Sequence, residues 1–343
     1  MMRDEALNIA IIGAGYWGKN LVRNFATADA CRLKYVCDLN DDVLKMHRRN
    51  FPFVEMTRDI ETVLADETIE AVAIATPVAT HCDLATRALR AGKHVYVEKP
   101  LTFRAMDTRA MIDLAQERKL KLMVGHLLEY HPAVSYLKDM LHDGRIGQPY
   151  YMYTQRVNLG IVRQNENAWW SLAPHDISVI CYLFGSEPTS VAVQGQCYLQ
   201  EGIEDVVFAT IKFADGKMAH VHCSWLDPHK IRKMTVVGPE KMVTFDDMEA
   251  TEKIRIYDKG ASVKHDVTTS YADIIALRLG DIVIPKIPGG EPLAAECEHF
   301  IACVRENRPV RSDGADGLRV VQILEAGQES LKRQGQPVSP GAF

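Results

Sequence analysis

Residues 7–18 read LNIAIIGAGYWG, and this stretch decides the fold that the sequence predicts. Its first six residues are mostly apolar and indicate a buried strand, and the glycines that follow are spaced as G-x-G-x-x-G. In this context Gly13 permits a tight turn, Gly15 lets the backbone approach a pyrophosphate, and Gly18 lets a helix pack closely on the strand. The helix N-terminus would present N–H groups to the phosphates. The stretch therefore predicts a dinucleotide-binding α/β fold, with a glycine turn that binds no cofactor as the alternative.

The nature of the dinucleotide is indicated by Asp38, which ends the second predicted strand 20 residues after Gly18. A carboxylate at this place accepts hydrogen bonds from the ribose hydroxyls of the adenosine half. The residues directly after Asp38 include no arginine that would bind a 2′-phosphate, so NAD is favoured over NADP. Tyr16 and Trp17 lie inside the glycine motif, where we expect them to pack around the phosphate loop as part of the cofactor site.

The rest of the first 125 residues repeats the pattern of a buried strand followed by a helix. Amphipathic stretches such as 78–91 predict crossover helices. Further parallel strands are predicted at 33–37, 71–75, 94–97 and 120–124. We therefore predict a Rossmann-type, doubly wound parallel sheet that forms an NAD-binding domain over residues 1–125.

After about residue 147 the sequence alternates between apolar and polar residues, which predicts a half-buried sheet. Asp215-Gly216 is a strong hairpin signal, and residues 174–184 predict a short helix. Strands are predicted at 150–157, 190–196, 206–213, 218–223 and 231–237. We therefore predict that residues 126–343 form a substrate-binding and oligomerisation domain of α+β class with a mostly antiparallel open sheet. The late helical stretches at 292–305 and 316–334 are candidates to pack back on the first domain.

Composition excludes several classes of protein. The chain has 343 residues and a formal net charge of -5 without any Lys/Arg-rich run, so nucleic acid is not an expected partner. No apolar run of about 18 residues predicts a membrane span. The N-terminal residues carry no recognisable export signal, and the eight cysteines are scattered. We therefore expect a cytoplasmic protein with reduced thiols.

Polar residues follow two predicted parallel strands, at the edge where ligands of such sheets bind. Thr76, Pro77 and His81 follow one strand, and Glu98 and Lys99 follow another. We place all five among the candidate cofactor contacts. From the sequence alone, His81 is more typical of a helix cap or packing residue. An ammonium at position 99 would stabilise a developing alkoxide, whereas a solvated surface lysine is the alternative.

Five segments together resemble the Gfo/Idh/MocA oxidoreductase family. They are AGYWGKN at 14–20, ATPVATH at 75–81, AGKHVYVEKP at 91–100, LAPHDIS at 172–178 and SDGADGLRVV at 312–321. The resemblance covers nearly the whole chain, and the E-K-P element is more specific than the glycine motif. Residues 153–160, YTQRVNLG, are most similar to members that act on nucleotide-linked sugars, such as UDP-N-acetylglucosaminuronate 3-dehydrogenases. The resemblance implies oxidation of a secondary hydroxyl, expected at C3 of a sugar or nucleotide sugar, and a homodimer or homotetramer.

The resemblance also implies that Lys99 and His175 are catalytic and flank the reacting carbon, with the nicotinamide between the domains. His175 follows Pro174, a common first-turn residue, so we expect it near a helix N-terminus whose dipole disfavours the imidazolium. A neutral imidazole would accept the hydroxyl proton while Lys99 holds the oxygen. A buried structural histidine is the alternative.

One residue departs from the family pattern. The family usually has an Asp four residues before this histidine, and here that position is Ser171. A serine carries no charge that would raise the basicity of the imidazole, so activity could be slower, altered in pH dependence or lost. Ser171 is expected either in the substrate site or as a helix cap. This departure keeps open the alternative of a non-catalytic NAD-binding sensor or partner protein. Independently of Ser171, a keto-sugar reductase of the same family is a related enzymatic alternative.

Other polar residues are candidate substrate contacts. Arg156, Asn158 and Arg163 lie in or just after the first strand of the second domain, where arginines would suit a carboxylate or a diphosphate. His126 follows the last strand of the first domain, near the expected cleft. Each could instead be an ordinary surface residue. The pair His220 and His222 lacks a third ligand at suitable spacing, so we predict a solvated strand face and no metal site.

Overall fold

The computed structural model describes residues 6–263 and 275–342, and it divides into two compact units. Unit 1 comprises Met1–Tyr130 and Gly290–Gln322, and unit 2 comprises His131–Gly289 and Ile323–Ala342. Residues 1–5, on which the expected lack of an export signal partly rests, lie outside the described residues. No helix in the described part of the chain is long and apolar enough to cross a membrane.

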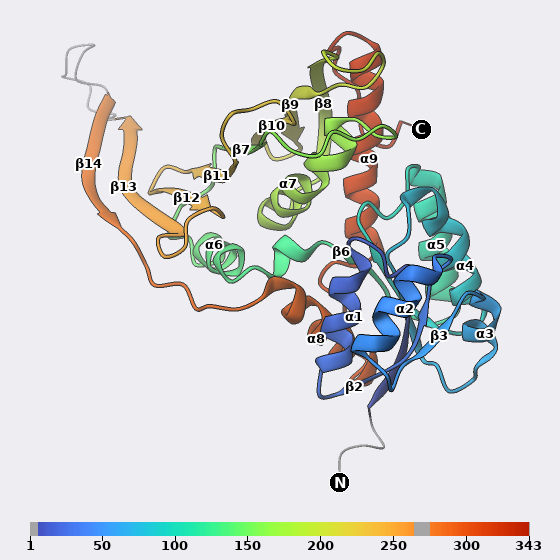
Figure 1. Ribbon diagram of the computed structural model, residues 1–343. Coiled ribbons are helices and arrows are strands. Elements are labelled where there is room, and N and C mark those ends of the chain that lie inside the picture. Colours follow the sequence, from blue (N-terminus) through green and yellow to red (C-terminus); the bar gives the residue numbers. More distant parts are fainter. Residues whose placement is uncertain (1–5, 264–274, 343) are drawn as a thin grey trace. The chain divides into compact units, whose positions relative to one another are not determined.

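Unit 1 contains a six-stranded parallel sheet flanked by helices (Figure 1). Its strand order is β3-β2-β1-β4-β5-β6, which confirms the predicted doubly wound fold. Strands β2 and β3 lie on one side of β1, and β4, β5 and β6 lie on the other side. The strand order therefore switches between β1 and β4, and ligands of such sheets bind at that switch point. The strands are β1 (Leu7–Ile12), β2 (Cys31–Cys37), β3 (Glu55–Thr57), β4 (Ala71–Ile74), β5 (His94–Glu98) and β6 (Leu122–Gly125).

Helices cover both faces of this sheet, so successive residues of one strand enter different cores. Ile9 and Ile11 of β1 belong to one apolar cluster, and Ala10 and Ile12 belong to another. Phe300, from a helix near the end of the chain, joins the first cluster. The helical segments of unit 1 are α1 (Gly18–Thr27), α2 (Asp41–Asn50), α3 (Ile60–Ala65), η1 (Val78–Thr80), α4 (His81–Arg90), α5 (Ala105–Glu117), η2 (Leu127–Tyr130) and α8 (Pro292–Arg305).

Unit 2 is built on an eight-stranded sheet in the order β14-β13-β12-β11-β7-β10-β9-β8. Neighbours in the described part of this sheet are antiparallel except β7 and β10, so the prediction of a mostly antiparallel sheet is confirmed. Gly216 has a φ of 85° in the predicted hairpin between β9 and β10. The strands are β7 (Tyr151–Val157), β8 (Pro188–Gln196), β9 (Val206–Phe213), β10 (Met218–Ser224), β11 (Ile231–Val237), β12 (Met242–Asp246), β13 (Ile254–Val263) and β14 (Ile275–Val283).

Helix α7 (Ala168–Phe184) packs on β7, β9 and β10, and its start corrects the predicted helix at 174–184. Asn167 is the N-cap, and its side chain accepts a hydrogen bond from the Trp170 N–H, so Ser171 is not the cap. Pro174 lies inside the helix. A proline normally ends a helix because it lacks an N–H. Here distant packing overrides that preference, since the Trp169 indole is buried and donates to the Leu324 carbonyl at 3.0 Å.

The other helices of unit 2 frame α7. Helix α6 (Pro132–His142) packs against α7. Helix α9 (Gly314–Lys332) begins in unit 1 and ends in unit 2, where the Gln328 side chain accepts a hydrogen bond from the Trp170 indole at 3.0 Å. The N-terminal half of α7, which carries Ser171 and His175, is therefore fixed by residues more than 150 positions away along the chain.

Candidate functional site

The three glycines of the phosphate loop meet three different geometric demands. Gly13 has a φ of 86°, which residues with side chains rarely adopt. A Cβ at Gly18 would lie 2.0 Å from the carbonyl oxygen of Gly13, so the start of α1 could not approach β1 this closely with any other residue. A Cβ at Gly15 would meet nothing within 4 Å. The loop therefore has open space beside Gly15, which fits a phosphate group of a dinucleotide.

Asp38 fastens this loop to the end of β2. Its Oδ2 accepts a hydrogen bond from the Ala14 N–H at 2.8 Å, and its Oδ1 accepts one from the Asn40 N–H at 2.9 Å. A carboxylate has about four acceptor sites, so two remain for the hydroxyls of a ribose. The residue expected to read the ribose thus also shapes the phosphate loop.

Tyr16 and Trp17 differ from each other in their surroundings. Tyr16 is 73% exposed, so the prediction that it packs around the loop is wrong. The Lys19 ammonium lies 5.6 Å from the centre of its ring instead. Trp17 is 37% exposed, and its indole N–H donates to the Glu98 carboxylate. Trp17 therefore links the phosphate loop to the end of β5.

His81 is a packing residue in this structure. Its ring is buried, with Nδ1 3.1 Å from the Pro100 carbonyl oxygen and Nε2 2.9 Å from the Thr76 carbonyl oxygen. Burial lowers the pKa of His81 below that of an exposed imidazole. The ring connects the segment after β4 that contains Thr76 and Pro77 to the turn at Lys99 and Pro100.

Glu98 is buried at the end of β5 and joins several elements of unit 1. Its carboxylate accepts hydrogen bonds from the Tyr96 hydroxyl and the Lys99 N–H, both at 3.3 Å. Burial raises the pKa of Glu98, while the hydrogen bond from Trp17 and the neighbouring Lys99 charge oppose that rise. The Tyr96 hydroxyl also lies 3.0 Å from a carboxylate oxygen of Glu296 in α8, so its single proton is shared between two buried carboxyl groups. The turn that carries Lys99 is therefore braced from the core of unit 1.

His126 lies inside unit 1, with only 2% of its surface exposed. Its Nδ1 is 3.3 Å from the Glu129 carboxylate, and the Glu129 side chain is buried as well. Burial lowers the pKa of His126 to about 4 and raises that of Glu129 well above its usual value. His126 is therefore an uncharged buried imidazole at neutral pH.

His175 stands in the middle of α7 and is half-buried. The helix begins at Ala168, so the expected position of His175 near a helix N-terminus is wrong. The field of a helix terminus falls off within the first turn, so it does not act on this imidazole. Ser171 precedes His175 by four residues and therefore lies on the same face of the helix.

Arg156 is buried beside this face and is engaged by Asp176. Its Nε and Nη2 donate to the two oxygens of that carboxylate at 3.1 and 2.8 Å. The pair joins β7 to α7 through a bidentate contact, so Arg156 acts in the core of the unit and not at an open surface. Asp176 is correspondingly occupied and cannot replace the aspartate missing at position 171.

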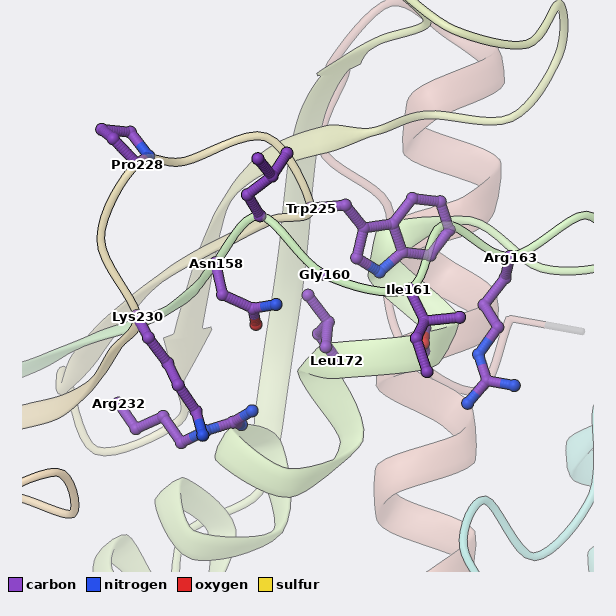
Figure 2. Close-up of a pocket in the computed structure, with 11 residues that line it drawn as sticks. Asn158, Gly160, Ile161, Arg163, Leu172, Trp225, Pro228, Lys230 and Arg232 are labelled. Atoms are coloured by element: carbon purple, nitrogen blue, oxygen red, sulfur yellow. The ribbon is translucent and has the colours of Figure 1, made fainter. Parts of the chain in front are cut away.

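Asn158, Arg163 and Ser171 line one pocket of about 410 Å³ in unit 2 (Figure 2). Two further cations, Lys230 and Arg232, line the same pocket and were not among the residues predicted from the sequence. They flank the first residue of β11, and this alternation of basic residues at a strand start was a visible signal. The remaining lining residues are Leu159, Gly160, Ile161, Leu172, Trp225 and Pro228.

The histidine pair on β10 packs with an aromatic ring. The ring of His222 stacks on Phe208 with centroids 4.3 Å apart, and the His220 ring lies nearly parallel to the same phenyl ring with centroids 6.4 Å apart. Within residues 6–263 and 275–342, no group of three or more His, Cys, Asp or Glu side chains is arranged to hold a metal ion.

Comparisons with known proteins cover both units. Residues 7–126 match the model described as an oxidoreductase family with an NAD-binding Rossmann fold, and residues 134–244 match the GFO/IDH/MocA C-terminal domain. The chain is 27% identical to UDP-N-acetylglucosamine 3-dehydrogenase from Acidithiobacillus ferrooxidans, over 95% of this chain and 99% of that protein. It is 26% identical to scyllo-inositol 2-dehydrogenase (NAD(+)) from Bacillus subtilis, over 98% and 96%.

Among solved structures, the fold matches UDP-N-acetylglucosamine 3-dehydrogenase GnnA from Acidithiobacillus ferrooxidans. The TM-score is 0.81 with 25% identity, over 96% of this chain and 99% of that one. The phosphate loop, the E-K-P turn and the fold of both units therefore agree with the family matches: the chain belongs to the Gfo/Idh/MocA family of NAD-binding oxidoreductases.

Proposed function

We propose that the protein oxidises a secondary hydroxyl, at C3 of a sugar or nucleotide sugar, with NAD as the hydride acceptor. The observation that carries this proposal is the match along almost the full length of both chains to a relative named as a UDP-N-acetylglucosamine 3-dehydrogenase. The polar pocket that reaches Ser171, one turn from His175, supports a hydroxylated substrate.

The proposed residues have distinct roles. The backbone at Gly13, Gly15 and Gly18 would hold the pyrophosphate, and Asp38 the adenosine ribose. NAD, when bound, supplies the site that accepts the hydride. His175 takes the proton of the substrate hydroxyl, and the Lys99 ammonium stabilises the oxygen as its negative charge grows.

Ser171 affects how strongly His175 acts as a base, and therefore which direction of the reaction is favoured. An aspartate one turn before His175 would stabilise the imidazolium, and neither Ser171 nor the occupied Asp176 supplies that charge. His175 is then a weaker base and a stronger acid than in relatives that have the aspartate. A stronger acid favours proton donation, so the reduction of a keto-sugar is the second candidate activity. The same residue supports a third candidate, an NAD-binding protein without turnover.

The test is a panel of sugars and sugar nucleotides with NAD, followed through the absorbance of NADH. We expect turnover of at least one C3-hydroxylated member, and we expect Ser171→Asp to raise the rate of oxidation at alkaline pH, where the imidazole stays uncharged and the added carboxylate makes it a stronger base. If NAD binds but no panel member reacts until Asp is introduced at position 171, the non-catalytic reading is correct for the natural chain. NADH oxidation by 3-keto sugars alone would favour the reductase.

We further propose that the chain forms a homodimer or homotetramer. Tyr151, Tyr153 and Phe208 are between 37% and 47% exposed on the strands β7 and β9 of the open sheet. Exposed aromatic side chains grouped in this way favour association. Light scattering during gel filtration measures the mass in solution, and a monomer at micromolar concentration would contradict this expectation.

A further inference from the structure

The pocket of Figure 2 is rich in positive charge that the protein itself does not pair. Within the described ranges, neither Lys230 nor Arg232 has a carboxylate within 4.0 Å of its cationic group or donates a side-chain hydrogen bond. Arg163 lies 3.7 Å from Glu166, so that charge is partly balanced. Figure 2 shows Lys230 and Arg232 on one side of the pocket and Arg163 on the other.

Arg232 stands in an environment that penalises its charge. It is directly opposite Arg156 in the pairing of β11 with β7, and like charges at such positions repel each other. Asp176 is engaged by both nitrogens of Arg156, and Asp247 is shared with His131 and Lys253. Burial and the neighbouring Arg156 lower the pKa of Arg232, although Asp247 and Asp176 oppose that change. A second arginine here is unfavourable for the free protein, because the local carboxylates are already occupied.

The walls of the pocket suit a sugar that carries an acidic group. Leu172 offers apolar atoms to the pocket, Trp225 contributes little surface because only 2% of it is exposed, and Asn158 adds an amide that can bind hydroxyls. The volume of about 410 Å³ lies in the range of small-ligand sites. Ser171 belongs to the lining and is about 6 Å along the helix axis from His175, at about 1.5 Å per residue.

We propose that this pocket is an anion-binding subsite, in which Arg232 and Lys230 bind the carboxylate or phosphate group of an acidic sugar substrate. The proposal rests on the proposed sugar dehydrogenase function and narrows it to anionic substrates. The guanidinium suits a planar carboxylate through two parallel hydrogen bonds, and both cations together suit a phosphate ester. An anion held here places the attached ring beside the His175 face of α7.

Binding without turnover tests the subsite. Calorimetric titrations of the NADH-loaded protein with glucuronate, glucose 1-phosphate and glucose exclude oxidation of the ligand, since no hydride acceptor is present. We expect the preferred acidic sugar to bind at least about 10-fold more tightly than glucose, and Arg232→Gln to remove most of that preference. A preference for glucuronate identifies a carboxylate, and a preference for glucose 1-phosphate identifies a phosphate. Equal affinities of the natural chain for all three sugars would overturn the proposal.

Lys233→Gln is the matched control. Lys233 follows Arg232 in β11, so its side chain points to the other face of the sheet, and the substitution removes the same charge. We expect this variant to keep the preference for the acidic sugar. If Lys233→Gln and Arg232→Gln reduce that preference equally, the pocket is not the binding site and the net charge of the protein is responsible.

The melting temperature shows whether a variant loses binding because it no longer folds. Because Arg232 repels Arg156, Arg232→Gln is expected to leave the melting temperature unchanged or to raise it. If it misfolds, Lys230→Gln on the exposed segment before β11 serves in its place. An acidic preference without turnover of any sugar would refute the proposed function and keep the subsite. Turnover of sugars without any preference for acidic sugars would support the proposed function and refute the subsite.

Discussion

The phosphate loop of unit 1 and helix α7 of unit 2 carry the two ends of the proposed chemistry, yet their structures are determined in different ways. The backbone of the loop follows mainly from the spacing of Gly13, Gly15 and Gly18, and contacts with Asp38 and Glu98 then hold it in place. Helix α7 continues through Pro174 because Trp169 and Trp170 bind α9 far along the chain. A local motif is therefore readable from the sequence, whereas a site that distant contacts position is not.

The largest effect is expected where α7 depends on another element. Asp176→Ala leaves the buried Arg156 without its bidentate partner, and an unpaired buried charge costs about 3–5 kcal/mol of unfolding free energy. Chemical denaturation measures this loss. The exposed Asp42→Ala, which removes a carboxylate from an ion pair on the surface, is the control and should change stability by less than about 1 kcal/mol. A similar small effect at both positions would mean that α7 does not depend on the buried pair.

The next largest effect is expected in unit 1, at a buried residue outside the phosphate loop. Burial lowers the pKa of His126 from 6.5 to about 4. The unfolded chain therefore takes up the proton first as the pH falls, so stability is lost from about pH 6.5 down to about pH 4. The loss from this one residue is at most about 3 kcal/mol.

Urea unfolding of the natural chain and of His126→Gln over this pH range measures that loss. The glutamine variant should lose less stability on acidification, because its side chain does not titrate. Parallel stability curves for the two proteins would show that His126 is protonated as easily in the folded state as in the unfolded chain.

A smaller effect on stability is expected in the loop, and it separates two of its glycines. Gly18→Ala places a Cβ against the Gly13 carbonyl and should cost about 2 kcal/mol. Gly15→Ala meets only open space and should leave stability nearly unchanged, but its methyl group would occupy room next to the backbone that a phosphate needs. Both variants should bind NAD more weakly. Unaltered NAD affinity in Gly15→Ala would remove that position from the cofactor site.

The difference between local pattern and distant packing also explains which strands and helices could be predicted from the sequence. The strands β1, β9 and β11 begin and end where their hydrophobic patterns do, because the side chains on one or both faces of each strand point into a packed core. The strand β3 was missed because it has only three residues, of which Glu55 is exposed. The start of α7 was missed because Pro174 is a strong local signal that tertiary packing overrides.

The sequence likewise indicated some residues of the candidate site and not others. Asn158, Arg163 and Ser171 line one pocket, but Arg156 next to them is occupied by Asp176. Lys230 and Arg232 could not be joined to them from the sequence, because only the pairing of β7 with β11 brings these segments together. The sequence shows which residues are cationic, and the register of the sheet decides which of them share a surface.

The most direct test of the proposed chemistry is the rate of NADH formation by the natural chain and by His175→Ala and Lys99→Ala, with the sugar nucleotide that the panel selects. We expect each variant to lose about 100-fold to 10,000-fold in turnover while its affinity for NAD, measured separately, stays nearly unchanged. Full turnover in either variant would contradict the role proposed for that residue, and full turnover in both would refute the mechanism.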